Sequence, residues 1–231
     1  MDRLVIACMD RRLNKYLDSL NDGRTIFLRN AGGNVGSLAS SIRYILNNHG
    51  IRRIHVVTHT DCGAMKVVAG ARDKSMKVSD TVQEGLVRYF NRVEFGNRGE
   101  LEKANEALQQ EAIAKLAGGG FEITTELFDI SKAGQHGGQG DHVLAITRAS
   151  DWKYEKIAGA SRSDLAEMYT VQADNIDEVM HDIEIAVGTI GIHDVRVVAL
   201  EASEYRPLRL DSNKLKAKPF SSGVHIDYIK A

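Results

Sequence analysis

The sequence predicts an α/β protein with a mostly parallel β-sheet flanked by helices, built as two tandem units of similar pattern. Three observations lead to this fold class. Short apolar segments alternate with segments of helical period, as in proteins built around a parallel sheet. One stretch of the chain resembles another that lies 141 residues later. A glycine-rich segment separates the two stretches. We therefore predict units at 1–133 and 141–231, joined by a linker at 134–140.

The first unit supplies strands and helices in alternation. Four segments rich in Val, Ile, Leu or Phe are predicted as strands, at 4–7, 25–28, 54–57 and 121–130. Three segments with helical period or composition are predicted as helices, at 38–46, 79–93 and 100–117. The first helix ends near Gly50, a usual helix stop. We interpret the many charges of the last helix as a solvated face and not as a binding site.

The second unit repeats most of this pattern. The offset of 141 places Gly50 on Gly191 and Val56 on Val197, and the helix before the glycine recurs. The other strands of the first unit are aligned, in order, with 143–146, 167–170 and 223–229. Because order, spacing and element type agree together, we interpret the pattern as an internal duplication and not as chance similarity between two βαβ units.

Composition places the chain among ordinary globular proteins. Of 231 residues, 43% are apolar and 26% are charged, and 30 basic residues against 31 acidic ones give a net charge of -1. This balance predicts neither nucleic-acid nor membrane partners, and no apolar run reaches the roughly 18 residues of a membrane span. Strand-like sequence begins at Leu4, which leaves no room for a signal peptide, so a cytoplasmic location is expected.

Two short motifs carry the candidate chemistry. Cys8-Met9-Asp10-Arg11-Arg12 follows the first predicted strand, and His59-Thr60-Asp61-Cys62-Gly63 follows the third. Sites in parallel sheets form beyond the carboxyl ends of the strands, so both motifs are expected at one edge. Two thiolates and one imidazole suit zinc, and three protein ligands leave a fourth position for water. The motifs therefore predict one Zn²⁺ per chain, held by Cys8, His59 and Cys62.

Asp10 and Arg12 form the next candidate pair. Asp10 is close enough to Cys8 in sequence to reach the metal or its water, and Arg12 can hold this carboxylate through paired hydrogen bonds. With the pair formed the fourth zinc position is open, and with the pair broken Asp10 can close it. Asp61 could act directly, orient neighbouring backbone or cap the following turn.

The segment from Arg29 to Asn34 also follows a strand and precedes a helix. Its glycines allow a small ligand to approach the backbone, and a helix N-terminus favours an anion. The candidate substrate-binding residues are Asn30, Ala31, Gly32 and Gly63. The other histidines lack ligand spacing and are predicted to be surface or packing residues.

The second unit has lost these groups. His59 falls on Leu200, Cys62 on Ser203 and Cys8 on Thr147, so no zinc ligand is repeated. The first unit is therefore the candidate active unit, and the second is a degenerate, structural partner.

The two motifs together resemble those of the β-class carbonic anhydrases. Cys8-x-Asp10-x-Arg12 is similar to the first motif of that family and His59-x-x-Cys62-Gly63 to the second. The sequences of the motifs are most similar to those of the archaeal-type branch. The resemblance is close over 1–65. It implies reversible hydration of carbon dioxide to bicarbonate, with Cys8, His59 and Cys62 as zinc ligands and Asp10 with Arg12 as the gating dyad.

The resemblance also implies paired subunits with each active site near their junction. The degenerate unit would then stand in for the second subunit and make a covalent pseudo-dimer with one working site. A homodimer of such pseudo-dimers is the further assembly that it allows. The pocket wall that a partner usually lends would come from the divergent unit.

Three other functions remain open at this point. The same zinc site could hydrolyse carbon disulfide or carbonyl sulfide, which differ from carbon dioxide in their demands on the channel. A non-catalytic zinc protein would bind zinc without turnover. A redox role for the two cysteines predicts a reversible disulfide and no metal.

Overall fold

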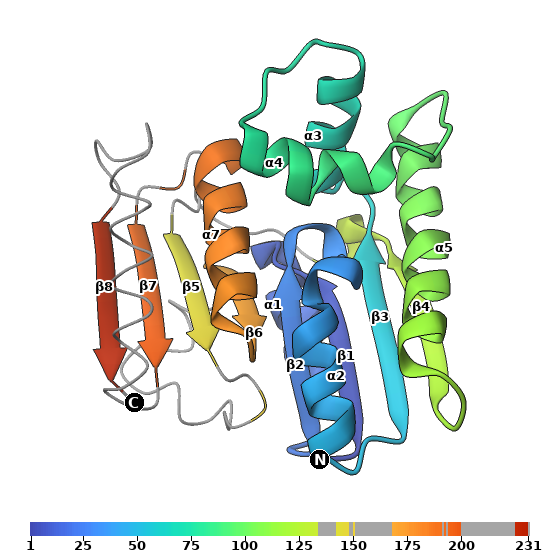
Figure 1. Cartoon of the computed structure of the whole chain (residues 1–231), viewed down its shortest axis with the longest axis vertical. Helices are drawn as coiled ribbons and strands as arrows, with labels where there is room; N and C mark the ends of the chain where they lie inside the picture. Colours follow the sequence, from blue (N-terminus) through green and yellow to red (C-terminus); the bar gives the residue numbers. More distant parts are fainter. Residues whose placement is uncertain are drawn as a thin grey trace.

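A computed structural model describes residues 1–133, 142–147, 150, 168–190, 192, 194–199 and 225–230. The predicted linker at 134–140 lies outside the described residues. Within them, eight strands form one sheet in the order β4-β3-β1-β2-β6-β5-β7-β8 (Figure 1). The strands are β1 Arg3–Cys8, β2 Thr25–Asn30, β3 Arg53–His59, β4 Glu122–Phe128, β5 His142–Thr147, β6 Tyr169–Ala173, β7 Asp194–Ala199 and β8 His225–Lys230.

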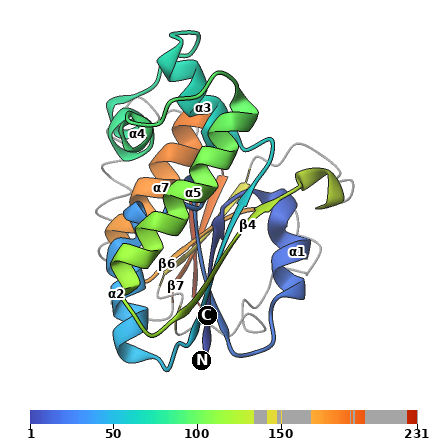
Figure 2. The ribbon, with the colours of Figure 1, turned by 90° about the vertical axis from the view of Figure 1, so that its right-hand side faces the viewer.

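Helices cover both faces of this sheet. The α-helices are α1 Asn14–Ser19, α2 Ala39–Asn48, α3 Gly63–Arg72, α4 Asp80–Gly85, α5 Arg98–Ala117 and α7 Ile176–Ile190. Short 3-10 helices are η1 Arg11–Leu13, η2 Ala31–Gly33, η3 Gly36–Leu38, η4 Val87–Phe90 and η5 Ile130–Ala133. Figure 2 shows α2, α5 and α7 on one face and α1 on the other. The predicted class, a mostly parallel sheet flanked by helices, is confirmed.

The strand order reads the same from the two ends of the sheet. β1 lies between β2 and β3, with β4 outside β3, and β5 lies between β6 and β7, with β8 outside β7. All pairs inside each half are parallel. The halves meet through an antiparallel pairing of β2 with β6 at Arg29 and Gln172. The two halves therefore build one continuous sheet of mixed direction.

The ladder registers refine the alignment made from sequence. With β1 superposed on β5, Arg53 falls on Asp194, which keeps the offset of 141. Ile26 falls on Tyr169, one residue from the predicted alignment, and β4 and β8 also shift by one residue. Such a shift reverses the face that each side chain takes. Short apolar strands fit either register in sequence, and only pairing with a neighbour decides between them.

The core lies on both faces of the central strands. Leu4, Val5, Ile6 and Ala7 of β1 are fully buried, as expected for a parallel strand covered on both sides. The apolar residues of α2 that were predicted from periodicity pack onto the sheet, with Ile42 and Ile45 fully buried. This buried strand carries the first motif to the edge of the sheet.

The prediction of a single helix at 79–93 is wrong in one respect. It is divided into α4 and η4 at Leu86, where the backbone leaves the helical region. A Cβ on Gly85 would lie 1.8 Å from the His181 ring, so α4 packs against α7 only because position 85 has no side chain. The glycine that ends α4 is therefore also its contact with the second half.

The predicted helix at 100–117 is confirmed as α5, which starts two residues earlier. Asn97 caps it by accepting from the backbone N–H of Glu100 at 3.0 Å, while Asn97 Nδ2 donates to the Glu100 carboxylate at 2.8 Å.

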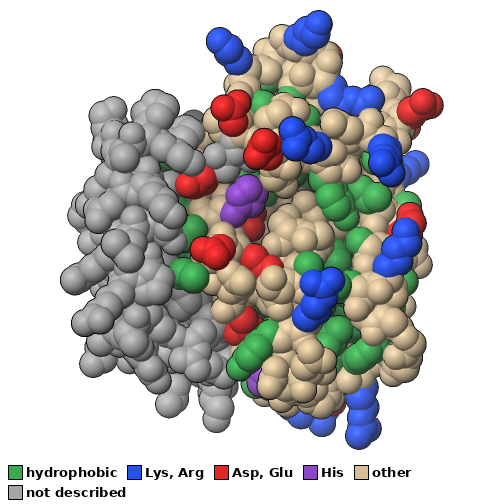
Figure 3. Space-filling view, viewed as in Figure 1, with side chains coloured by type: hydrophobic (Ala, Val, Ile, Leu, Met, Phe, Trp, Pro, Cys, Tyr) green, Lys and Arg blue, Asp and Glu red, His purple; other side chains and the backbone are tan. Residues whose placement is uncertain are grey.

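A groove of about 700 Å³ follows the seam between the halves, on the face that carries α2 and α7. Figure 3 shows acidic side chains gathered over α7 along this seam. Glu178 of α7 accepts from the backbone N–H groups of Ser40 and Ser41 at the start of α2. In the described part of the chain, no helix combines the length and the apolar character needed to cross a membrane.

Candidate metal centre

The ends of β1 and β3 bring the two cysteine motifs together. Cys8 is the last residue of β1 and His59 the last of β3, and these neighbouring strands are parallel, so both side chains reach the same edge of the sheet. Asp61 then takes a left-handed backbone conformation with φ 54°, which asparagine and aspartate tolerate better than most residues. This turn reverses the chain and places Cys62 at the N-cap of α3.

The three side chains form one compact group. The sulfurs of Cys8 and Cys62 are 4.0 Å apart, and all three candidate ligand atoms lie within 4.8 Å of one another. Two sulfurs bound to one tetrahedral zinc at about 2.3 Å would be about 3.8 Å apart. Cys8, His59 and Cys62 are also buried, at 4%, 1% and 1% exposure. The spacing of the donors therefore fits a zinc ion with little rearrangement.

The His59 ring is oriented for metal binding. Its Nδ1 lies 2.9 Å from the Thr60 carbonyl, which can only accept, so Nδ1 carries the proton of the neutral ring. Its Nε2 is buried and has no hydrogen-bond partner within the described residues. A buried polar atom without a partner is costly unless something binds it. A hydrogen bond from Nδ1–H to a carbonyl is also the usual support of a metal-binding histidine.

The two thiols differ in acidity when no metal is bound. The hydrogen bond with Cys8 lowers the pKa of Cys62, and the N–H groups of Met65 and Ala64 at the start of α3 lower it further. The same hydrogen bond with Cys62, together with burial, raises the pKa of Cys8. In the metal-free pair, Cys8 therefore holds its proton more tightly than Cys62, and Cys62 is the first of the two thiols to ionise.

Arg12 holds Asp10 in a two-pronged ion pair. Arg12 Nε donates to Asp10 Oδ1 at 3.0 Å, and Arg12 Nη2 donates to Oδ2 at 2.8 Å. Burial raises the pKa of Asp10, but the hydrogen bonds and charge of Arg12, together with the nearby His59, lower it more and leave the pKa below its ordinary value. Asp10 Oδ2 lies 3.8 Å from His59 Nε2, so the carboxylate is next to the metal group but is held by the arginine.

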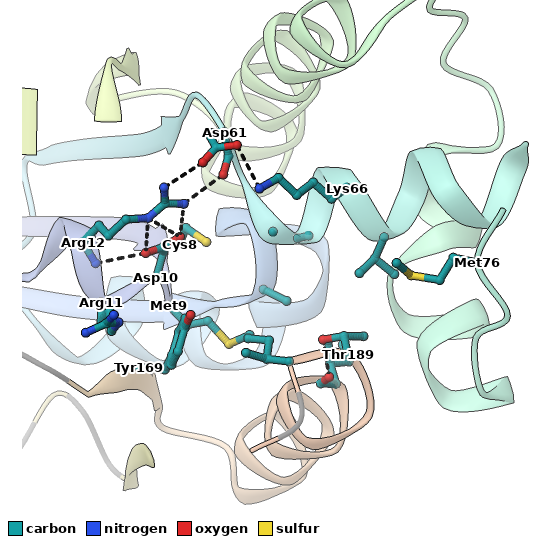
Figure 4. A pocket seen from close by; sticks show the side chains of 16 residues that line it. Cys8, Met9, Asp10, Arg11, Arg12, Asp61, Lys66, Met76, Tyr169 and Thr189 are labelled. Atoms are coloured by element: carbon teal, nitrogen blue, oxygen red, sulfur yellow. Dashed lines mark hydrogen bonds and ion pairs between the residues drawn. The ribbon is translucent and has the colours of Figure 1, made fainter. Parts of the chain in front are cut away.

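Asp61 is the second anchor of Arg12 (Figure 4). Arg12 Nη1 donates to its carboxylate at 2.8 Å, and Lys66 and Arg98 lie 2.9 and 3.2 Å from the other oxygen. Burial alone would raise the pKa of Asp61, yet the hydrogen bonds from Lys66 and Arg12 bring it to about 2. The contact of Asp61 with the Arg12 side chain differs from the backbone orientation that was predicted for it.

A buried arginine supports the backbone of the first motif. The Arg29 guanidinium donates to the carbonyls of Cys8 at 3.1 Å and Asp10 at 2.9 Å, and to Asn14 Oδ1 at 2.5 Å. Since a buried charge needs several partners, this arrangement fixes the path of the chain from Cys8 to Asp10. Sequence reasoning missed this role, because a single arginine at the end of a strand carries no signal of its target.

A cavity of about 500 Å³ opens beside the metal group, and both halves line it. The first half contributes an ionic side with Asp10, Arg11, Arg12, Asp61 and Lys66. The apolar side includes Met9, Ala31, Ala64, Val67 and Met76 of the first half together with Ile185 and Ile190 of the second. Tyr169 and Thr189 of the second half complete the lining.

The four candidate substrate-binding residues have different positions. Ala31 and Gly63 line the cavity. Asn30 does not; it is fully buried, and its amide closes the loop by bonding to the backbone of Asn34 at 2.7 and 2.8 Å. Gly32 is also outside the lining and has φ 76°, a conformation that favours glycine. Asn30 and Gly32 therefore shape the loop that presents Ala31.

The prediction that the charged side chains of α5 form a solvated face is wrong for the side of the helix that contacts the metal group. Glu102 is only 5% exposed and accepts from the backbone N–H of Cys62 at 3.1 Å. Asn105 and Gln109 are buried beside it. Composition could not reveal this, because a buried polar stripe and a solvated one contain the same residues.

Comparison with known proteins connects the first half to one family. Residues 3–117 match the family model described as carbonic anhydrase, and this range contains the whole metal group and α5. A search of curated proteins found no match.

Among solved structures, the chain is similar to a β-carbonic anhydrase of Sordaria macrospora, described as tetrameric, at 14% identity and a TM-score of 0.45, over 57% of this chain and 77% of the other. A carbonic anhydrase of Streptococcus mutans aligns at 22% identity with a TM-score of 0.40, over 57% and 77%. A carbon disulfide hydrolase aligns at 22% identity with a TM-score of 0.36, over 57% and 75%.

Proposed function

We propose that the chain is a zinc-dependent carbonic anhydrase of the β class, which hydrates carbon dioxide reversibly to bicarbonate. The observation that carries the proposal is the buried group of Cys8, His59 and Cys62, in which His59 Nε2 has no partner among the described residues and faces two thiols. The match of residues 3–117 to the carbonic anhydrase family supports the same conclusion. The sequences of the motifs within this range favour the archaeal-type branch.

Cys8, His59 and Cys62 would hold one zinc ion and leave one coordination position for water. Zinc in such a site lowers the pKa of bound water to about 7 and so supplies a hydroxide nucleophile at neutral pH. Cys62 is well placed to ionise, and the Thr60 carbonyl keeps the imidazole lone pair on Nε2. The protein thus provides the deprotonated sulfur and neutral nitrogen that zinc requires.

Asp10 serves as a hydrogen-bond acceptor for the attacking water. Its carboxylate stays ionised because Arg12 lowers its pKa, and Arg12 is itself fixed by Asp61. In this arrangement Asp10 is withheld from the metal position, which corresponds to the open state of the site. Breaking the Arg12 contacts would free Asp10 to take the position of the water.

The cavity suits an apolar substrate and an anionic product. Carbon dioxide can lie against the apolar wall that ends at Met76 and Ile190, two partly exposed apolar residues at 40% and 37% exposure. Bicarbonate would be attracted by the positive side chains of Arg11 and Lys66, which line the same cavity. The apolar and the charged parts of the lining would therefore serve the substrate and the product, respectively.

The second half would replace the second subunit of a dimer. Arg29 and Gln172 are equivalent in the strand registers, and they pair with each other, as residues near a two-fold axis do. One pair of contacts near them is matched as well. Ala31 N–H donates to Asp182 at 2.9 Å, and at the equivalent positions Asp174 N–H donates to Ser41 Oγ at 2.8 Å. These reciprocal contacts support an internal duplication that forms a pseudo-dimer.

Both cysteines are free thiols, which suits a reducing compartment and favours a cytoplasmic location.

Stopped-flow hydration of carbon dioxide tests the proposal. Protein loaded with one zinc per chain should show a rate that rises with pH between about 6 and 9, as the pKa near 7 of zinc-bound water requires. The Cys62→Ser variant should show the buffer rate. Release of sulfide from carbon disulfide or carbonyl sulfide, without hydration of carbon dioxide, would instead identify a hydrolase on the same site. Bound zinc with none of these activities would identify a non-catalytic zinc protein.

A further inference from the structure

Helix α5 presents a buried polar stripe to the metal centre. Glu102, Asn105 and Gln109 are three and four residues apart, so they lie on one face of the helix. They are 5%, 2% and 0% exposed. A helix that only packed against a sheet would place apolar side chains there, so these polar groups indicate a specific task.

Two of the three residues support the loop that forms the cavity wall. Asn105 Nδ2 donates to the Gly32 carbonyl at 3.0 Å, and Gln109 Oε1 accepts from Val35 N–H at 2.8 Å. Gln109 Nε2 also donates to Asn105 Oδ1 at 2.8 Å, which ties the two amides together. The amides therefore hold the backbone within η2 and just after it.

The third residue, Glu102, is bound directly to a candidate metal ligand. Its Oε1 accepts from the backbone N–H of Cys62 at 3.1 Å and lies 3.6 Å from Arg98 Nε. Arg98 in turn is 3.2 Å from Asp61, the residue that holds Arg12. The Glu102 carboxylate thus fixes the position of the Cys62 peptide. It is also the last member of a row of alternating charges that runs from Asp10 through Arg12, Asp61 and Arg98.

We propose that Glu102 is a positioning residue of the metal centre, which holds Cys62 in its ligating orientation and so sets the affinity of the site for zinc. The inference rests on the metal centre of the proposed function. Cys62 precedes α3, and its N–H has no helical carbonyl to donate to, so a buried acceptor is required. Without that acceptor the Cys62 peptide would rotate to find another partner, and the sulfur would turn with it.

The test compares two substitutions at one position. Glu102→Gln keeps an oxygen acceptor for Cys62 N–H and nearly the same volume, but loses the charge opposite Arg98. Glu102→Leu removes the acceptor as well. Glu111→Gln and Glu111→Leu are matched controls on the same helix, because the Glu111 side chain is exposed and pairs only with Lys115 among the described residues. Thermal melts of the metal-free proteins check that each variant folds.

Zinc affinity is measured by competition with a chromophoric chelator, and the full chain is also loaded with Co²⁺ to record the ligand-field and sulfur charge-transfer bands. Outer partners of metal ligands usually change affinity by about 10- to 100-fold. We expect a loss in this range for Glu102→Leu, with altered Co²⁺ bands, a smaller loss for Glu102→Gln, and none for the Glu111 variants.

Affinity of Glu102→Leu within twofold of the unmodified chain, with unchanged Co²⁺ bands, would overturn the inference while leaving the proposed function intact. An equal loss in Glu102→Leu and Glu111→Leu would also overturn it, since the effect would then be general to the helix. An unmodified chain that takes up no zinc would overturn the inference and the proposed function together.

Discussion

The two halves of the sheet differ in what stands at the ends of equivalent strands. In the first half, β1 ends at Cys8 and β3 at His59, followed by Cys62. In the second half the equivalent residues are Thr147, Leu200 and Ser203, of which only Thr147 lies in the described part of the chain. The backbone order is the same on both sides. The strand arrangement alone therefore does not make a site; two side chains at strand ends and a third at the N-cap of α3 do.

The second half contributes in another way. Its helix α7 and strand β6 place Ile185, Thr189, Ile190 and Tyr169 in the wall of the cavity beside the first half's metal group. One half thus offers the reactive groups and the other encloses them. Under the proposed duplication, the second unit would have lost its ligands and been retained for the surface that it presents.

Removal of a metal ligand should have the largest effect, and it tests most sharply whether the two halves differ in zinc binding and activity. Cys62→Ser should abolish zinc uptake and lower carbon dioxide hydration by more than about 100-fold, since even an outer partner of a ligand can cost that much. Ser203→Ala, at the equivalent position of the second half, should leave zinc content and rate unchanged. Atomic absorption and stopped-flow assays of both variants decide this; a similar loss in Ser203→Ala would break the comparison.

The reciprocal contacts between the halves differ in their response to pH. Asp182 is 1% exposed and accepts from Ala31 N–H, while its other oxygen has no partner within the described residues. Burial raises its pKa to about 7, because the loss of solvation outweighs the lowering by the Ala31 hydrogen bond, and the nearby Glu178 adds a smaller increase. Ser41, its equivalent, cannot titrate.

This raised pKa predicts that stability falls as pH increases. The folded chain keeps the Asp182 proton up to about pH 7, whereas the unfolded chain releases it near 3.9. The stabilisation is therefore complete below pH 4 and lost as pH rises through 7, by at most about 4 kcal/mol. Urea unfolding from pH 5 to 8 should show this slope, and Asp182→Asn should flatten it. Asp177→Asn, an exposed change on the same helix, should not; an unchanged slope in Asp182→Asn would contradict the account.

Arg12 offers a smaller effect within the first half. Arg12→Ala releases Asp10 and should lower hydration by about 100-fold, the scale of a lost proton-handling group, with zinc still bound. Arg12→Lys keeps the charge but not the paired geometry, and it should recover only part of the rate. A metal assay beside the kinetic one distinguishes this from ligand loss. Full activity in Arg12→Ala would show that the Asp10 contact is only structural.

The wall supplied by the second half should have the smallest effect. Ile190→Trp narrows the cavity at a partly exposed position, and it should lower kcat/KM for carbon dioxide by about tenfold with zinc content and Tm unchanged. Tyr44→Trp introduces the same residue on α2, outside this cavity, and should have no effect. Equal rates in the two variants would show that α7 does not line the path of the substrate.

Sequence predicted the parts of this architecture that depend on local pattern. Apolar runs located β1 and β3, helical periodicity located α2, and motif spacing brought Cys8, His59 and Cys62 together at one sheet edge. The parts that depend on distant contacts were not predictable. Glu102 meets Cys62 across 40 residues and Ala31 meets Asp182 across 151. Nothing in the composition of α5 or α7 tells which polar side chain will be buried, because burial is decided by the surface that each helix meets.

Native mass spectrometry of the metal-loaded chain tests the central asymmetry most directly, because it counts zinc ions per chain without any assay of turnover. We expect one zinc per chain in the unmodified protein and in Ser203→Ala, and none in Cys62→Ser. A second tightly bound zinc, or one zinc retained in Cys62→Ser, would contradict a single metal centre built by the first half.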